Sequence, residues 1–207
     1  FGTLLLAGLG AFVGGYFVAP KPYVDAALRL QRKAAGLVTR ELVVDGHRII
    51  FGDGGQGEPL LVLHGFGATR DNWLLLAKEL TPRLRVIAPD IPGYGDSDQH
   101  ANADYSLDAQ LARLDAFVDA LGLTRFHLAG NSMGGYLAGH YARRHPERVS
   151  SLWLIAPAGV SSAQPSEVVA AVERGENPLL VRDLADFDRI LRLCFVHPPY
   201  TPTQFKK

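Results

Sequence analysis

Apolar and polar positions alternate along the middle of the chain with two different periods. Short apolar runs suited to buried strands lie at 60–63, 84–88, 125–129 and 148–155. Between them, apolar residues recur every three or four positions at 71–80, 106–121 and 133–145, which predicts helices with one buried face. Asp71 and Ser106 stand where the first two helices would begin and are expected to cap them. This alternation predicts an α/β protein, with a mostly parallel sheet and helices on both faces.

Two further segments flank this core. Residues 41–51 alternate around Asp45-Gly46, and this dipeptide predicts a hairpin that leads into the sheet. After Gly159 the strand pattern stops, and residues 166–172 and 186–195 predict two short amphipathic helices.

The N-terminal segment has a different character. Residues 1–20 contain no charged side chain, and as a helix they would span ~30 Å, about one hydrocarbon core. We therefore expect a single-pass transmembrane anchor. A cleaved signal peptide and a buried core helix are the alternatives. Pro20, at the position where cleavage would fall, argues against the signal peptide.

Residues 21–40 follow the proposed anchor and are rich in basic side chains. Arg29, Arg32 and Lys33 alternate with apolar residues, which predicts a basic juxtamembrane helix able to lie on anionic headgroups. An ordinary solvated helix is the alternative, and Gly36 is expected to end the helix in either case. The side of the membrane on which the rest of the chain lies is left open.

Composition narrows the possible partners. Of the 207 residues, 47% are hydrophobic, and 21 basic residues balance 21 acidic ones. A net charge of zero gives no electrostatic basis for binding nucleic acid. Cys194 is the only cysteine, so an internal disulfide and a cysteine-based zinc site are excluded. The seven histidines show no metal-ligand spacing, and we expect no metal and no cofactor.

The first candidate catalytic motif is G-x-S-x-G, spelled Gly130-Asn131-Ser132-Met133-Gly134. It lies between the strand at 125–129 and the helix at 133–145. A strand that turns directly into a helix forces the central residue into a strained conformation, which needs neighbours almost without side chains. Gly130 and Gly134 meet that need. Ser132 would then be an exposed nucleophile, and the Met133 N–H would face the same space. The alternative is a glycine-rich turn with an idle serine.

A second motif, His64-Gly65-Phe66-Gly67, follows the strand at 60–63. Acyl transfer benefits from two backbone donors that hold the oxyanion. The N–H of Phe66, flanked by Gly65 and Gly67, is the candidate for the second donor. A third segment, 90–98, follows the strand at 84–88 and forms a long loop with the spelling D-x-P-G-x-G-x-S.

These three motifs, in this order over residues 41–160, resemble the α/β-hydrolase superfamily. Trp73 and the stretches 132–135 and 156–159 are most similar to membrane-anchored lipases of the monoacylglycerol-lipase type. The resemblance implies a serine ester hydrolase that acts on acylglycerols or similar lipid esters. It also implies that residues 161–207 begin a cap, or lid, over the active site.

The resemblance assigns roles to two further residues and leaves two roles unfilled. In this superfamily the acid and the histidine follow the serine. His64 and Asp90 precede Ser132, so we interpret His64 as bonding loop backbone and Asp90 as ordering its loop. We expect the triad acid and histidine beyond Lys207. The chain would then be an N-terminal fragment that lacks the last strands and is nearly inactive alone.

Two other functions fit part of the pattern. The spelling Gly130 to Gly135 also occurs in hydrolases that cleave carbon–carbon bonds of ring-fission products, but a soluble enzyme of that kind has no use for an anchor. A non-catalytic hydrolase-fold module is the other alternative. The intact elbow and oxyanion loop argue against it.

Overall fold

The computed structural model describes residues 19, 21–160, 162 and 167–201. They divide into two units, each described by itself. The larger is Leu28–Val160 and contains every strand found in the described residues. The smaller includes α6 (Glu167–Glu173) and α7 (Leu184–Cys194), two short helices close to where the sequence predicts them.

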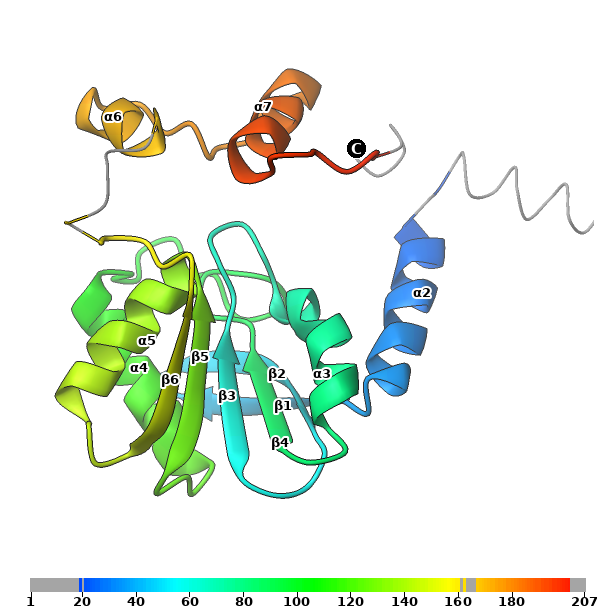
Figure 1. Cartoon of the computed structure of the whole chain (residues 1–207), viewed down its shortest axis with the longest axis vertical. Coiled ribbons are helices and arrows are strands. Elements are labelled where there is room, and N and C mark those ends of the chain that lie inside the picture. The colour runs from blue at the N-terminus through cyan, green and yellow to red at the C-terminus, as the bar shows by residue number, and fades with distance from the viewer. Residues whose placement is uncertain (1–18, 20, 161, 163–166, 202–207) are drawn as a thin grey trace, which may run out of the picture. The chain divides into compact units, whose positions relative to one another are not determined.

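The larger unit is built on a six-stranded sheet with the order β1-β2-β4-β3-β5-β6 (Figure 1). β1 pairs antiparallel with β2 and β2 with β4, whereas β3, β4, β5 and β6 run parallel. The strands are β1 (Val38–Val44), β2 (His47–Gly54), β3 (Pro59–Leu63), β4 (Arg85–Pro89), β5 (Phe126–Asn131) and β6 (Val149–Ile155). The mostly parallel α/β architecture predicted from the sequence is therefore confirmed.

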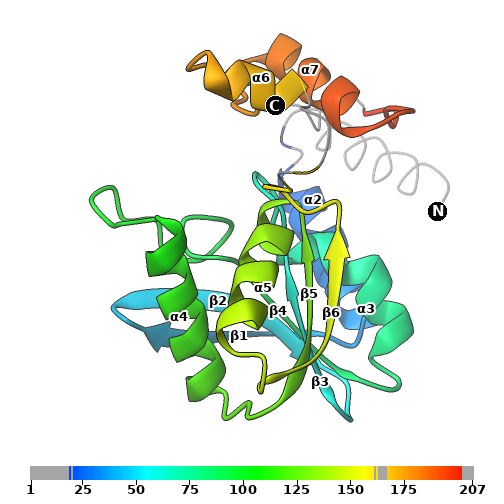
Figure 2. The ribbon, with the colours of Figure 1, turned by 60° about the vertical axis from the view of Figure 1, so that its left-hand side comes forward.

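Helices cover the two faces of this sheet (Figure 2). Leu61, Leu63 and Leu128 point to one face, where they pack in one core with α4 (Leu107–Ala120) and α5 (Met133–Arg144). Their neighbours Leu60, Val62 and Ala129 point to the other, against α3 (Leu74–Leu80) and the short 3₁₀ helix η1 (Arg70–Trp73). Because successive strand residues face opposite sides, an uninterrupted apolar strand supplies both cores.

The turn and cap residues predicted from the sequence were partly correct. Asp45 and Gly46 adopt φ angles of 48° and 70°, as the predicted two-residue hairpin turn requires. Ser106 caps α4 by accepting a hydrogen bond from Ala109 N at 3.4 Å, also as predicted. The prediction that Asp71 caps the helix expected at 71–80 was wrong. Thr69 is the cap of η1, and its hydroxyl accepts from Asp71 N.

Asp71 instead binds the N-terminal helix α2 (Lys21–Ala34). Arg32 donates two hydrogen bonds to its carboxylate, at 2.8 and 2.6 Å. Gly36, with φ 70°, ends α2 as predicted, and Leu37 N bonds back to Arg32 O at 2.9 Å. The helix thus stops before residue 38, where β1 begins. A planar guanidinium matched to a carboxylate in this fork is a strong pairing, so it fixes the end of α2 to η1.

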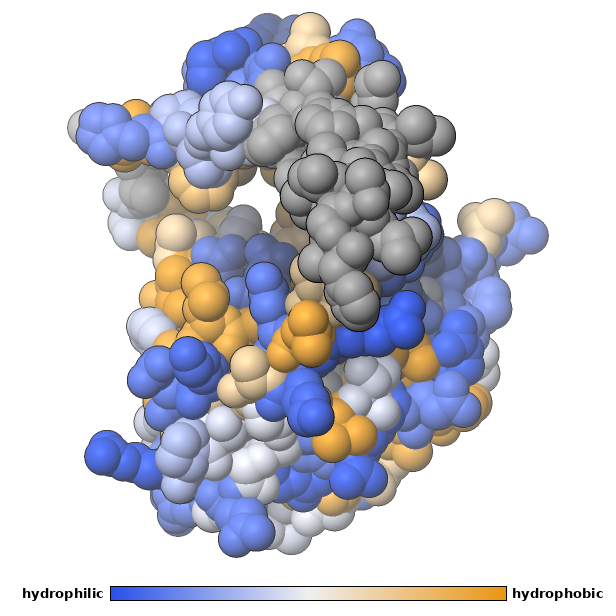
Figure 3. Space-filling model, turned by 90° about the vertical axis from the view of Figure 1, so that its right-hand side faces the viewer, coloured by the Kyte–Doolittle hydropathy of each residue, from blue (hydrophilic) through white to orange (hydrophobic). Residues whose placement is uncertain are grey.

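Exposed apolar side chains on the side of the molecule that carries α2 and α3 are scattered among hydrophilic ones (Figure 3). Leu30 on α2 and Leu75 on α3 are among the exposed large apolar side chains. Among the helices that the structure describes, none has the length and apolar content needed to cross a bilayer. The anchor predicted at residues 1–20 lies, except for Ala19, outside the described residues.

Candidate active site

Ser132 occupies a tight turn between β5 and α5. Its φ of 50° and ψ of −114° are unusual for a residue with a side chain, and such a conformation costs about 1–3 kcal/mol. Backbone hydrogen bonds hold it in place. Ser132 N donates to Ile155 O at 3.0 Å, and Ser132 O accepts from Tyr136 N at 2.9 Å and Ala158 N at 3.0 Å. The strain predicted for the G-x-S-x-G turn is thus present at the serine.

The flanking glycines are required because backbone lies against them. A Cβ on Gly130 would lie 2.2 Å from Gly134 O, and a Cβ on Gly134 would lie 2.2 Å from Leu63 O. No side chain fits at either distance. The turn after β5 therefore packs directly on the end of β3, where the second motif begins.

The second motif faces the serine. A Cβ on Gly65 would come within 3.4 Å of Ser132 Cβ and 2.9 Å of Asn131 Oδ1, so this loop lies against the elbow. Phe66 is the next residue, and Met133 opens α5, where backbone N–H groups lack helical partners. The fold therefore brings both candidate oxyanion residues close to Ser132.

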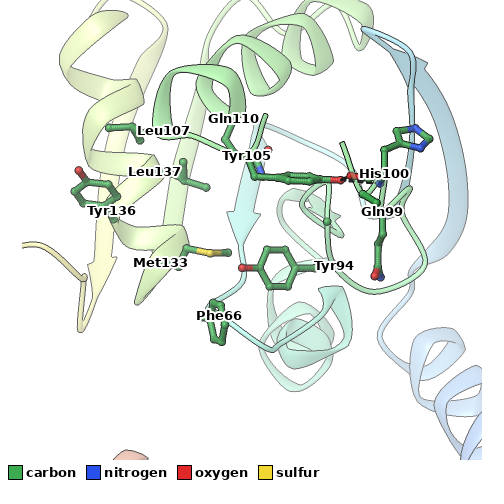
Figure 4. A pocket seen from close by; sticks show the side chains of 12 residues that line it. Phe66, Tyr94, Gln99, His100, Tyr105, Leu107, Gln110, Met133, Tyr136 and Leu137 are labelled. Atoms are coloured by element: carbon green, nitrogen blue, oxygen red, sulfur yellow. Dashed lines mark hydrogen bonds between the residues drawn. The ribbon is translucent and has the colours of Figure 1, made fainter. Parts of the chain in front are cut away.

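The side chains of Phe66 and Met133 also line one cavity of about 730 Å³. Its wall is formed mainly by the loop after β4 and by the first turns of α4 and α5 (Figure 4). The remaining lining residues are Gly93, Tyr94, Gln99, His100, Ala101, Tyr105, Leu107, Gln110, Tyr136 and Leu137. An apolar space of this size, next to a strained serine, suits a hydrocarbon chain.

His64 is fully buried and bridges two backbone segments. Its Nδ1 donates to Gly65 O at 2.8 Å, and its Nε2 accepts from Ile91 N at 2.9 Å. Burial lowers the pKa of the His64 imidazole. The ring therefore stays neutral with the proton on Nδ1, the state that satisfies both partners. This geometry matches the loop-bonding role expected for His64 from the sequence.

Asp90 lies at the centre of a buried charge network. Its carboxylate accepts from the Arg70 guanidinium, from Arg70 N at 2.7 Å and from Asp96 N at 2.9 Å. Arg70 also donates to the Asp96 carboxylate at 2.7 Å. The carboxylate thus orders the loop after β4, as expected. The buried role of Arg70 was not predicted from the sequence, since nothing in the local sequence distinguishes it from an exposed arginine.

The larger unit holds a serine–histidine–carboxylate chain that does not involve Ser132. Ser151 Oγ lies 2.7 Å from His127 Nδ1, and His127 Nε2 lies 2.9 Å from Glu58 Oε2. Ser151 stands within β6, paired in register with His127 on β5, and no helix begins beside it. Ser151 therefore lacks the strand-to-helix turn that aims the N–H groups at the start of a helix toward one point, so the resemblance to a triad is superficial.

Ser132 has no histidine partner within the larger unit, Leu28–Val160. Its side chain makes no capping hydrogen bond at the start of α5. The other histidines of this unit are held elsewhere: His47 by Asp45 O, His100 near Asp98, His140 against the Tyr136 ring, and His145 near Asp115. Within the described ranges, no group of His, Cys, Asp and Glu side chains has the geometry of a metal site.

Comparison with known proteins identifies the family. The family model for the alpha/beta hydrolase fold matches residues 58–198, more than half of the chain. The protein therefore belongs to the alpha/beta hydrolases, and the resemblance noted from its motifs is confirmed.

Individual relatives are lipases. The chain is 35% identical to Lipase 1 of Psychrobacter immobilis over 86% of its own length and 57% of that lipase. It is 33% identical to the human monoacylglycerol lipase ABHD6, over 93% of its own length and 60% of the relative's. The chain thus spans less than two thirds of these curated relatives.

A solved structure of a membrane phospholipase A, described as a bacterial virulence factor, is also similar. It shares 43% identity and a TM-score of 0.86, over 99% of this chain and 66% of that one.

Proposed function

We propose that the protein is a serine ester hydrolase of the lipase type. The observation that carries this proposal is the strained Ser132, held between β5 and α5 with the Gly65–Gly67 loop against it. A fold alone does not define a reaction, and a strained serine beside two candidate donors is the feature that supports acyl transfer. The lipase relatives support the same reaction class.

In the proposed mechanism, Ser132 Oγ attacks the ester carbonyl and forms a tetrahedral intermediate. The N–H groups of Phe66 and Met133 hold the oxyanion, and the alcohol leaves to give an acyl-enzyme that water hydrolyses. A histidine takes the proton from Ser132 and returns it to the leaving alcohol, oriented by an acid. We propose that this acid and histidine follow Lys207, and that no cofactor takes part.

The cavity predicts a dependence on acyl-chain length. Each CH₂ buried among apolar side chains such as Leu107 and Leu137 contributes about 0.8 kcal/mol. With full-length protein in detergent micelles, kcat/KM for a series of acyl esters is expected to rise from acetate to octanoate. A preference for acetate esters, or turnover only of a ring-fission ketone, would contradict a lipase and favour a short-chain esterase or a carbon–carbon hydrolase.

We also propose that residues 1–20 anchor the protein in a membrane and that basic residues of 21–40 contact its headgroups. The uncharged sequence of this segment supports the proposal. Full-length protein is expected in the membrane pellet after high-salt and carbonate washes, whereas a chain that begins at Lys21, and so keeps α2 and β1, should be released. Recovery of the full-length protein in the supernatant would show that the anchor is wrong.

A further inference from the structure

Tyr94 brings a hydroxyl group into the cavity beside the candidate oxyanion residues. Its ring packs edge-on against His64, at 5.5 Å between centroids, and against Phe66, at 5.9 Å. Figure 4 shows the hydroxyl directed across the cavity toward Met133. It forms no hydrogen bond with any other residue that the structure describes. The group is therefore free to bind something that enters the cavity.

The backbone of Tyr94 is held firmly. Tyr94 N donates to Ile91 O at 2.9 Å, and Tyr94 O accepts from Ser97 N at 3.2 Å. Gly95, with φ 56°, packs so closely on Asp90 that a Cβ there would lie 2.4 Å from the carboxylate. Because the buried Asp90 fixes this loop, Tyr94 loses little conformational freedom when it binds a ligand.

Three other polar side chains of the cavity wall, those of Tyr105, Gln99 and Gln110, already make hydrogen bonds within the wall. The Tyr105 hydroxyl accepts from His100 N at 2.8 Å and lies 3.2 Å from His100 O. The amide groups of Gln99 and Gln110 donate to Gly95 O at 3.2 Å and Pro92 O at 2.8 Å. Burial raises the pKa of the Tyr94 phenol, so this hydroxyl keeps its proton and can donate at neutral pH.

We propose that Tyr94 is a specificity-determining residue whose hydroxyl binds a hydroxyl on the alcohol portion of the lipid ester. The inference rests on the proposed ester hydrolysis and assigns to one residue the recognition of the alcohol portion of polyol esters such as glyceryl esters. In such an ester the nearest hydroxyl is only a few bonds from the reacting carbonyl. Tyr94 stands beside Phe66 and Met133, whose N–H groups would hold that carbonyl. The apolar remainder of the cavity covers the hydrocarbon.

Tyr94→Phe tests this role, because it removes the hydroxyl and keeps the ring. With full-length enzyme, KM for monooctanoylglycerol is expected to rise about tenfold at unchanged kcat, whereas KM for propyl octanoate stays the same. Tyr105→Phe is the matched control, since its hydroxyl is already bonded to His100. It should not change the ratio of kcat/KM values for the two esters. An equal loss on both esters, or no loss on either, would overturn the proposal.

A binding measurement separates this proposal from the proposed function. Octylglycerol ether and octyl propyl ether have no ester to hydrolyse, so their Kd values report recognition alone. Wild-type protein is expected to bind octylglycerol ether about tenfold more tightly, and Tyr94→Phe should remove this difference. If no ester is hydrolysed but the difference is present, only the proposed function fails. If the two ethers bind equally to wild-type protein, the role of Tyr94 is refuted.

Discussion

Full-length protein with Ser132 replaced by alanine is expected to lose ester hydrolysis by about 10⁴–10⁶ in kcat. Covalent labelling by a fluorophosphonate probe should disappear with it. Alanine adopts the φ of 50° no less readily than serine, so the free energy of unfolding should hardly change. The measurements are initial rates, probe labelling followed by peptide mapping, and a denaturation curve for each variant.

Ser151→Ala provides the matched control. This serine hydrogen-bonds His127, but it lies within β6 and not at a strand-to-helix turn. Its replacement should leave hydrolysis and labelling intact. Probe labelling that survives Ser132→Ala, or that is lost in Ser151→Ala, would show that the nucleophile has been misassigned.

Asp90→Ala is expected to destabilise the protein by about 3–5 kcal/mol, because it leaves the Arg70 guanidinium buried without its main partner. The side chains of Arg70 and Asp90 are only 4% and 0% exposed. Asp96 does not replace this partner fully, since its side chain is 67% exposed. Urea denaturation at neutral pH measures the change in the free energy of unfolding.

Asp71→Ala is the comparison for this prediction. Its partner Arg32 is 21% exposed and can recover contact with water, so the loss should be clearly smaller, about 1 kcal/mol. Similar losses for the two variants, or a loss below about 1 kcal/mol for Asp90→Ala, would mean that the buried network contributes little to stability.

The elements of the core could be predicted because their signals are local. Apolar runs located the strands, Asp45-Gly46 located the hairpin turn, and Ser106 located the start of α4. The elbow could be predicted equally well. The glycines that flank Ser132 are required by close backbone contacts, some within a few residues and one with the end of β3.

Contacts between distant segments could not be predicted in this way. Aspartate is a common helix cap, but the Asp71 carboxylate binds Arg32 instead. These two residues are far apart in the sequence, and they meet only because of how α2 packs. The burial of Arg70 likewise depends on the loop after β4. The position of Tyr94 in the cavity depends on that same loop. Pattern and propensity describe single elements, whereas these pairs are properties of the assembled sheet.

The strand order also determines when a newly synthesised chain can form its reaction centre. β3 lies between β4 and β5 in the sheet but leaves the ribosome before either of them. The β1–β2 hairpin is local and can close early, whereas Phe66 meets Met133 only after α5 has emerged. β4 can pair with β3 earlier, but until β5 has emerged the other edge of β3 has no partner strand, and such an exposed apolar edge invites aggregation. We therefore expect the nascent protein to depend on chaperones until its elbow is complete.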